Sequence, residues 1–434
     1  MMKRLSFFIA LAAALLVACS DNDSFSSSTG NQLTFETDTV KFDTLFSTVP
    51  SATETFWVYN HSGDGIRIQT VRLERGNQSG FRVNVDGTYL DPVGNDFEVR
   101  KGDSLLVFVE VTTRENHATD PQLVEDNLLF TLESGVQQRV NLRTHSWDAK
   151  KISNLVIERD TLIETTEPLV VYGAGIMVDE GATLTLRNTT LYFHDGAGIE
   201  VNGRLVAEGC TLRGDRLDHM FDYLPYDRVP AQWGGVTMTP TSAGNTLTNC
   251  EIRNATNALV CDSTDVQLTA TIIHNSGGVG LWATDAEVAL SYCQLTNTMG
   301  DCLRLEGCQA VVDHCTLAQF YPFTANRGAA LRFTTTKQPL LLVCTNTLAT
   351  GYDDDVVMGE QPDSTIVFDY RFEDCLLRTP EVKDTVRFKR ILWETAKDSI
   401  QGTKHFRTID EENLYYDFRL DSISPAFQKG IGCL

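Results

Sequence analysis

Apolar and polar residues alternate along most of the chain, in short runs bounded by Gly, Asn, Asp and Thr. This period of two predicts β-strands, and a helical period is almost absent. The chain is therefore expected to be all-β. Roughly 400 ordered residues exceed one compact core, so two domains or an elongated repeat is expected.

The first part of the chain carries short strand-like runs separated by turn residues. They are ETFWVYNHS (54–62), IRIQTVRLE (66–74), FRVNVDG (81–87), DSLLVFVEVTT (103–113), NLLFTLES (127–134) and QRVNLRTHS (138–146). Such spacing predicts a β-sandwich over residues 33–147. The order of these runs resembles the immunoglobulin-like modules of the abnormal-spindle/hydin type. That resemblance implies a spacer or an interaction surface, not a catalyst.

The second part carries a repeat of about 22 residues, typical of a solenoid. One apolar column contains Ile176, Ile199, Val236, Leu259, Leu281, Leu303, Leu331 and Val357. A second column contains Thr189, Cys210, Cys250, Thr271, Cys293, Cys315, Asn346 and Cys375, each two residues before a Leu or Ile. Three short strands per repeat predict one rung of a parallel β-helix over 150–434, with Leu and Ile in the lumen and Cys or Thr in a tight inner corner.

Two features complete the predicted β-helix. Asn254, Asn275 and Asn297 recur at one turn, where stacked amides could hydrogen-bond from rung to rung. Residues 382–427 are expected to form the last turns and a C-terminal cap, because a solenoid must cover its final rung.

Three stretches resemble right-handed single-stranded parallel β-helix proteins of the pectate-lyase-like superfamily. They are residues 173–214 (GAGIMVDEG onward), QWGGVTM (232–238) and DFRLDSISPAFQKGIG (417–432). The resemblance implies the fold. It does not imply an activity, because the superfamily contains lyases, hydrolases, adhesins and inert modules.

The N-terminus combines Lys3 and Arg4 with an apolar run that is too short to span a bilayer comfortably. It ends in LVAC, residues 16–19, which resembles a bacterial lipobox. We therefore expect a signal peptide over 1–18, a lipid on Cys19, and a flexible tether over 19–32. The implied partner is a membrane, and the implied location is the outer membrane, on its surface or periplasmic side.

Net charge narrows the class of partner. The whole chain carries −22, which becomes −24 without Lys3 and Arg4. This charge argues against nucleic acid as a partner. Ten cysteines remain after Cys19, and most occupy the inner-corner column, so we expect mainly free, structural thiols.

The outward positions beside the first column suggest a ligand groove. Trp282, Arg304 and Arg332 follow one another on successive rungs, and Glu200 occupies the same column. The position before each inward residue is mostly Gly or Ala, which predicts a floor of small residues. An indole could stack on a sugar and guanidinium groups could bind carboxylates, although a merely solvated strand face is the alternative.

A long insertion, residues 215–233, is expected either to wall this groove or to cover apolar surface. Its Tyr223 and Tyr226 are further candidate ligand-binding residues.

The sequence GYDDDVVMG supplies the weak catalytic candidates Asp353, Asp354 and Asp355, with Asp301 at the equivalent turn two rungs away. Asp353 and Asp355 could hold calcium and Arg332 could act as a base, as in polysaccharide lyases. Solvated charge at a turn is the simpler alternative. No cofactor other than this calcium is expected, and no zinc-ligand spacing occurs.

Three functions remain open from the sequence. The first is a monomeric outer-membrane lipoprotein whose β-helix binds a polysaccharide or an envelope protein without catalysis. The second is a calcium-dependent polysaccharide lyase or a glycoside hydrolase. The third is a structural or assembly module of the envelope.

Overall fold

The computed structural model describes residues 24–118, 120–221 and 223–433. The predicted signal peptide and Cys19 lie outside these residues. The chain divides into two compact units, Met1–Trp147 and Asp148–Leu434, each with its own hydrophobic core. Among the described residues, no helix is long and apolar enough to cross a membrane.

The first unit is the predicted sandwich, built from two five-stranded sheets around one core. One sheet has the order β1 (Thr34–Phe35), β3 (Glu54–Tyr59), β8 (Ser104–Val111), β5 (Phe81–Val85) and β6 (Thr88–Tyr89). The other has the order β2 (Thr39–Phe46), β10 (Gln137–Trp147), β9 (Gln122–Leu132), β4 (Ile66–Leu73) and β7 (Val93–Val99). In β8, Val107 and Val109 are buried while Phe108 between them is exposed, as strand alternation requires.

Part of the predicted tether, residues 24–32, lies within the described residues. Phe25 forms a parallel bridge with Gly65 before the chain enters β1. Backbone hydrogen bonds between residues 24–26 and Gly65 hold the start of this segment, so the flexibility predicted from Ser and Gly content is corrected for residues 24–26.

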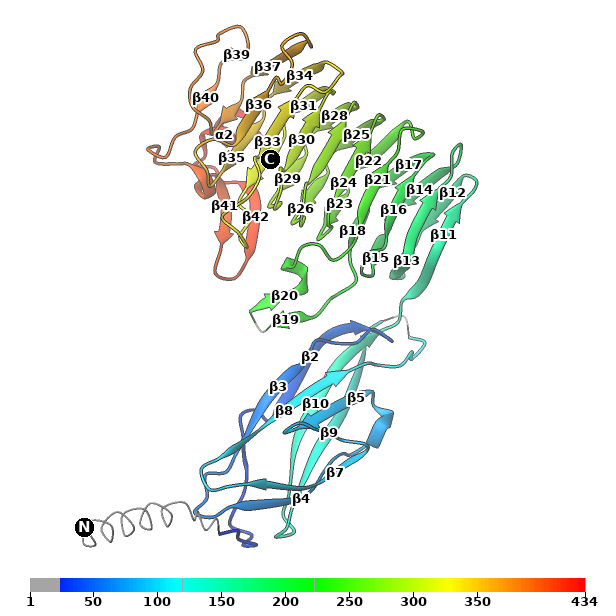
Figure 1. Cartoon of the computed structure of the whole chain (residues 1–434), viewed down its shortest axis with the longest axis vertical. Coiled ribbons are helices and arrows are strands. Elements are labelled where there is room, and N and C mark those ends of the chain that lie inside the picture. Colours follow the sequence, from blue (N-terminus) through cyan, green and yellow to red (C-terminus); the bar gives the residue numbers. More distant parts are fainter. Residues whose placement is uncertain (1–23, 119, 222, 434) are drawn as a thin grey trace, which may run out of the picture. The chain divides into compact units, whose positions relative to one another are not determined.

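The second unit is a parallel β-helix in which each complete rung contributes three short strands, stacked along the axis as Figure 1 shows. The first strands are β16 (Gly198–Val201), β21 (Gly235–Met238), β24 (Leu259–Asp262), β27 (Leu281–Thr284), β30 (Leu303–Glu306), β33 (Leu331–Thr334) and β36 (Val357–Glu360). The second strands are β12 (Thr161–Glu164), β14 (Thr183–Arg187), β17 (Arg204–Glu208), β22 (Asn245–Thr248), β25 (Asp265–Thr269), β28 (Glu287–Ser291), β31 (Gln309–Asp313), β34 (Leu340–Thr345), β37 (Phe368–Glu373) and β39 (Phe388–Lys389).

The third strands are β15 (Thr190–Phe193), β18 (Thr211–Gly214), β23 (Glu251–Arg253), β26 (Ile272–His274), β29 (Gln294–Thr296), β32 (Thr316–Gln319), β35 (Leu348–Gly351), β38 (Leu376–Leu377) and β40 (Leu392–Trp393). Two long strands, β11 (Lys150–Ile157) and β13 (Leu169–Val178), begin the coil, and β13 pairs with both β15 and β16. First and third strands join in one 18-stranded sheet, and the second strands form a ten-stranded sheet.

The first apolar column is confirmed by strand register. Ile176 pairs with Ile199, and the pairing continues rung by rung through Leu281, Leu303 and Leu331 to Val357. Nearly all of these side chains belong to one continuous buried core. Burying one such side chain contributes roughly 1.5–3 kcal/mol, so the stacked column stabilises the coil along its length.

The second column needs one correction. Leu317 pairs with Ala349, and Ala349 pairs with Leu377, so Thr347 and not Asn346 stands below Cys315. The Thr347 hydroxyl accepts a hydrogen bond from the Cys315 amide at 3.2 Å. The corrected column contains only Cys and Thr.

Asn346 instead belongs to a turn position in the left-handed backbone region. Its φ is 48°, and the residues one position before the other Cys and Thr column members also have positive φ, namely Asn188, Gly209, Asn249, Ala270, Tyr292, His314 and Asp374. Asn and Asp tolerate this conformation better than most residues, which explains why they recur here.

The asparagine ladder is also corrected. The Asn254 side-chain amide donates to the backbone carbonyls of Asp227 and Val229, and that of Asn275 donates to the carbonyl of Arg228. These asparagines therefore fasten the insertion 215–233 instead of bonding to one another. The insertion contains β19 (His219–Phe221), β20 (Leu224–Pro225) and a single 3₁₀ turn, Tyr226–Arg228.

The C-terminal segment packs along the side of the coil. It contains a 3₁₀ turn (Gly402–His405), the hairpin β41 (Phe406–Asp410) and β42 (Tyr415–Leu420), and the short helix α2 (Pro425–Lys429). Phe406, Phe418 and Leu420 form a buried cluster with Leu348 and Leu376 of the third strands. Trp393 packs separately against Phe388 in the last rung, with ring centroids 5.3 Å apart.

Candidate functional site

Two charged pairs lie on the outward face of successive first strands. Strand register places Trp282, Arg304, Arg332 and Met358 in one column, as the sequence predicted. Consecutive strands are about 4.8 Å apart, so these side chains are immediate neighbours along the axis.

The first pair joins Arg304 to Glu306. The Arg304 Nε and Nη2 atoms lie 2.9 and 2.6 Å from Glu306 Oε1, while Trp282 Nε1 donates to Oε2 at 3.0 Å. Burial alone would raise the pKa of Glu306, but the hydrogen bonds from Trp282, Arg304 and Thr284 outweigh it and lower this pKa. Glu306 is thus an ionised acceptor and is poorly suited to act as a general acid.

Trp282 contacts both members of this pair. The Arg304 guanidinium lies over the indole, 4.9 Å from the ring centroid. The face of the indole toward the next rung is therefore occupied, and a sugar cannot stack there. Trp282 thus positions both Arg304 and Glu306, and sugar stacking on its other face stays a prediction.

The second pair joins Arg332 to Asp301. Arg332 Nε lies 3.0 Å from Asp301 Oδ2, and Asp301 Oδ1 also accepts from the Ala329 amide at 2.7 Å. Asp301 is 4% exposed, and the Arg332 Nη1 atom lies 3.4 Å from the well-exposed Glu360. Arg332 therefore bridges a buried carboxylate and a solvent-facing one.

An open cavity of about 620 Å³ lies at these pairs. Its lining comprises Val279, Gly300, Asp301, Arg304, Glu306, Gly328, Arg332, Thr334, Thr335, Thr336, Glu360 and Pro362. Thr335 is 5% exposed, and its hydroxyl has no hydrogen-bond partner among the described residues. The site thus offers guanidinium donors, carboxylate acceptors and hydroxyl groups side by side.

Sequence reasoning missed Glu306, Glu360 and the threonines. Glu306 follows Arg304 by two positions on β30, and Glu360 follows Met358 by two on β36. Residues two apart on a strand share a face, so this signal was present in the sequence. The predicted floor of small residues is corrected: Cys302, Ala330 and Val356 are almost fully buried, and Val279, Gly300 and Gly328 line the cavity instead.

The structure does not bring the remaining predicted ligand residues into this cavity. Glu200 lies on β16, three rungs before Trp282, and hydrogen-bonds Asn202. Tyr226 lies under the Arg216 guanidinium at 4.1 Å, and Tyr223 stacks on Phe221 at 5.6 Å. The insertion containing both tyrosines is fastened to third strands through Arg253 and Asn254.

The three-aspartate turn contacts a different arginine. Asp354 pairs with Arg378 at 2.9 Å, the Asp353 carbonyl accepts from the same guanidinium, and Asp355 accepts from the Thr379 hydroxyl. All three aspartates are exposed. Within the described residues, no cluster of three His, Cys, Asp or Glu side chains is arranged to hold a metal ion. Asp353 and Asp355 are therefore not part of such a cluster, and calcium at this turn stays a prediction.

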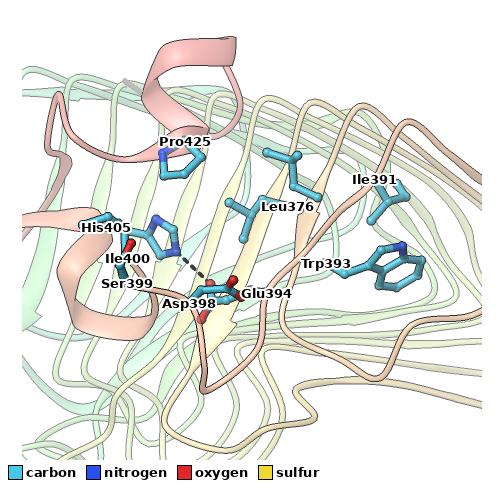
Figure 2. Close-up of a pocket in the computed structure, with 10 residues that line it drawn as sticks. Leu376, Ile391, Trp393, Glu394, Asp398, Ser399, Ile400, His405 and Pro425 are labelled. Atoms are coloured by element: carbon cyan, nitrogen blue, oxygen red, sulfur yellow. Dashed lines mark hydrogen bonds and ion pairs between the residues drawn. The ribbon is translucent and has the colours of Figure 1, made fainter.

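A second cavity, of about 370 Å³, lies beside the last rungs and is shown in Figure 2. Leu376, Ile391, Leu392, Trp393, Ile400 and Pro425 form its apolar part, and Glu394, Asp398, Ser399 and His405 its polar part. The dashed line in Figure 2 joins His405 to Glu394, whose Nε2 and Oε2 atoms are 2.8 Å apart.

His405 also contacts a serine, which gives the order Ser424, His405, Glu394. The Ser424 Oγ lies 2.8 Å from His405 Nδ1, whereas in a hydrolytic triad the serine contacts Nε2 and the acid contacts Nδ1. Furthermore, Ser424 is fully buried, and its Oγ accepts from the Ala426 amide as the N-cap of α2. The hydroxyl is therefore engaged in holding the C-terminal segment and cannot reach a substrate.

The comparisons with known proteins bear on the fold. Residues 141–336 match the family model of the right-handed beta-helix region. No curated protein matches the chain.

Three solved structures show weaker likeness. The ASH/PapD-like domain of human CEP192 is 11% identical, with 29% of this chain and 90% of that chain covered and a TM-score of 0.19. The catalytic domain of a GH87 alpha-1,3-glucanase in complex with tetrasaccharides is 8% identical, with 82% and 88% covered and a TM-score of 0.23. A family 123 glycoside hydrolase from Clostridium perfringens is 6% identical, with 27% and 26% covered and a TM-score of 0.19. Such low scores carry no argument about activity, and it is the family match that supports a right-handed parallel β-helix.

Proposed function

We propose that this chain is an outer-membrane lipoprotein, lipidated at Cys19, whose β-helix binds a neutral polysaccharide without catalysis. The cavity at Arg304 and Arg332 is the binding site. The main support for this proposal is that both guanidinium groups are already paired with carboxylates of the same chain. Arginines that bind the carboxylates of an acidic glycan are expected to be unpaired in the free protein, and these two are not.

Paired donors and acceptors suit sugar hydroxyl groups. Each hydroxyl both donates and accepts a hydrogen bond, so a diol can bridge a guanidinium and the carboxylate beside it. Arg304 and Arg332 face three carboxylates, those of Asp301, Glu306 and Glu360, so the local charge is slightly negative. A polyanion is therefore disfavoured, which narrows the polysaccharide expected from the sequence to a neutral one.

The geometry gives less support to catalysis. A lyase of the predicted kind needs calcium held by clustered carboxylates, and the carboxylates of Asp354 and Asp355 are directed to Arg378 and Thr379. A hydrolase needs one protonated carboxyl group, and the pKa of Glu306 is lowered. No observation favours the structural-module alternative over binding.

The test is titration calorimetry of the protein beginning at Ser20 with neutral polysaccharides and with polyuronates, with calcium or with EDTA. We expect binding to a neutral polysaccharide that is insensitive to EDTA and forms no new reducing or unsaturated ends. Arg304→Ala combined with Arg332→Ala is expected to abolish it. Arg187→Ala is the matched control, since Arg187 also lies near two glutamates on another face of the coil.

Trp282→Phe separates two roles of the indole. It keeps the aromatic ring but removes the Nε1 donor to Glu306, so binding should weaken if Trp282 positions Glu306. Unchanged affinity in Trp282→Phe would show that the indole contributes only its volume and that its hydrogen bond to Glu306 does not matter for binding. Product formation, preference for polyuronates, or unchanged affinity in the double arginine variant would overturn the proposal.

A further inference from the structure

Residues 24–26 of the sandwich unit are hydrogen-bonded to residues 64–65, just before β4. The Ser26 amide donates to the Gly65 carbonyl at 3.1 Å, and the Gly65 amide donates to the Ser24 carbonyl at 2.7 Å. The Ser24 hydroxyl also donates to Asp64 at 2.6 Å. We call this attachment of residues 24–26 to residues 64–65 the N-terminal bridge.

Side-chain packing makes the bridge specific. A Cβ atom at position 65 would lie 2.7 Å from two ring carbons of Phe25, so the ring fits only over a glycine. The Arg67 guanidinium lies 4.5 Å from the centroid of the same ring and is held by Glu98 at 2.9 Å. Phe25 is therefore fixed between a glycine and a cation that is itself positioned.

We propose that the N-terminal bridge holds one end of the sandwich against the surface of the membrane. The inference rests on the lipidation of Cys19 proposed above. From Cys19 to Ser24 the chain can reach at most about 18 Å, at 3.3–3.6 Å per residue. Without the bridge, the reach from Cys19 to Thr34 at the start of β1 would be about 50 Å.

The surface that meets the lipid headgroups is the end of the sandwich around Gly65. It includes the turn after β3, and the turn between β7 and β8, where the Gly102 amide donates to the Asn60 carbonyl. The turn between β9 and β10 also lies there, because the Glu133 amide donates to the Arg67 carbonyl. Charges of both signs occur on this end, including Lys101 and Asp64. The short tether, and not charge attraction, therefore selects the bilayer as the partner.

The test measures energy transfer from a fluorophore on the sandwich to a rhodamine-labelled headgroup lipid. The full-length lipidated protein is placed in vesicles of phosphatidylethanolamine and phosphatidylglycerol. A maleimide dye is attached at Lys101→Cys near the bridge or at Asn77→Cys at the opposite end, in a Cys433→Ser background. The other nine cysteines of the described residues are buried and protected from the dye. The eight residues of β4 separate the two ends by about 25 Å, at about 3.3 Å per residue.

We expect stronger transfer from the dye at 101 than from the dye at 77. Phe25→Ala combined with Ser26→Pro removes the ring and one amide donor of the bridge, so this difference should largely disappear. Ser27→Ala is the matched control and should preserve it. Equal transfer from both dyes, or an unchanged difference in the bridge variant, would overturn the proposal.

Two further measurements separate failure of the bridge from failure of lipidation. The mass of the N-terminal peptide shows whether Cys19 carries lipid, which tests only the proposed location. Hydrogen exchange of the Gly65 amide in the protein beginning at Ser20 tests the bridge without any lipid. We expect protection that is lost in the Phe25→Ala, Ser26→Pro variant, and exchange at the unprotected rate in the parent protein would refute the bridge.

Discussion

The buried carboxylate of Glu394 offers the sharpest test of what holds the C-terminal segment on the coil. Its Oε1 accepts from Arg378 at 2.7 Å, from the Gly402 amide at 2.8 Å and from Thr350 at 3.0 Å. Its Oε2 accepts from His405. The side chains of Glu394, Arg378 and His405 are all at least 95% buried. One carboxylate thus joins third strands of the coil to the segment that covers them.

Glu394→Gln keeps the shape of the side chain and removes its charge. Arg378 would then retain a buried positive charge whose other carboxylate partner, Asp354, is largely solvent-exposed. Breaking a buried ion pair by removing one partner costs about 3–5 kcal/mol. Asp354→Asn is the matched control, because it removes the exposed partner of the same guanidinium and should cost at most about 1 kcal/mol.

Hydrogen exchange reports this loss where it occurs. The Gly432 amide donates to the Asn346 carbonyl, and its protection measures whether the C-terminal segment stays on the coil. If the segment opens locally, a loss of 3–5 kcal/mol accelerates this exchange by about 100- to 4,000-fold, at about 1.4 kcal/mol per factor of ten. Exchange in Glu394→Gln within tenfold of the parent would refute the assignment of this pair as the attachment.

The effect of pH on this pair has a definite sign. Burial alone would raise the pKa of Glu394, but the hydrogen bonds and charges of His405 and Arg378 outweigh it and lower this pKa. A lowered carboxyl pKa contributes stability above the unfolded value, about 4.3, and this contribution is lost as the pH falls through the folded pKa. The difference between parent and Glu394→Gln should therefore shrink below about pH 4.

Two further substitutions test the packing of the coil. Gly235→Ala should prevent folding of the rung or cost more than about 3 kcal/mol in urea unfolding, because its Cβ would lie 1.7 Å from the Asn257 carbonyl oxygen at a φ of +93°. Gly181→Ala is the control: its φ is +82° but nothing lies within 4 Å of its Cβ, so it should cost only about 1–2 kcal/mol. Equal costs for the two substitutions would contradict the clash. Leu295→Ala should cost about 2–5 kcal/mol because Leu295 is fully buried in the lumen, whereas the partly exposed Leu341→Ala should cost under about 1 kcal/mol.

Periodic features were predictable from the sequence, because stacking forces equivalent residues into register. The column from Ile176 to Val357 and its outward neighbours Trp282, Arg304 and Arg332 all emerged from spacing alone. The register failed at Asn346, where a longer repeat brought Leu348 to the expected offset. Strand register and the left-handed backbone of Asn346 distinguish it from Thr347, and spacing alone carries neither signal.

Contacts made by non-periodic segments were not predictable. Glu394 meets His405 because the chain turns back after the last rung, and no repeat relates the two positions. The same holds for Phe25 on Gly65, since the Ser-rich composition before it predicted only flexibility. For the candidate site, the arginines were found but their partners were not assigned to them: the spacing already placed Glu306 on the same strand face as Arg304, whereas Asp301 lies before β30 and has no such signal for its pairing with Arg332.

The distribution of covering segments supports the choice of binding face. Two segments cover the outward side chains of the third strands. The insertion covers the early rungs, where its Asp227 pairs with Arg213 and Arg253. The C-terminal segment covers the late rungs, where its His405 binds Glu394. The insertion and the C-terminal segment approach each other where the Arg228 guanidinium lies 5.9 Å from the centroid of the Tyr415 ring. A ligand on this face would have to displace both segments, at the cost of their buried ion pairs. The first-strand face instead presents its arginine–carboxylate pairs around an open cavity, so a polysaccharide can bind there without rearranging the fold.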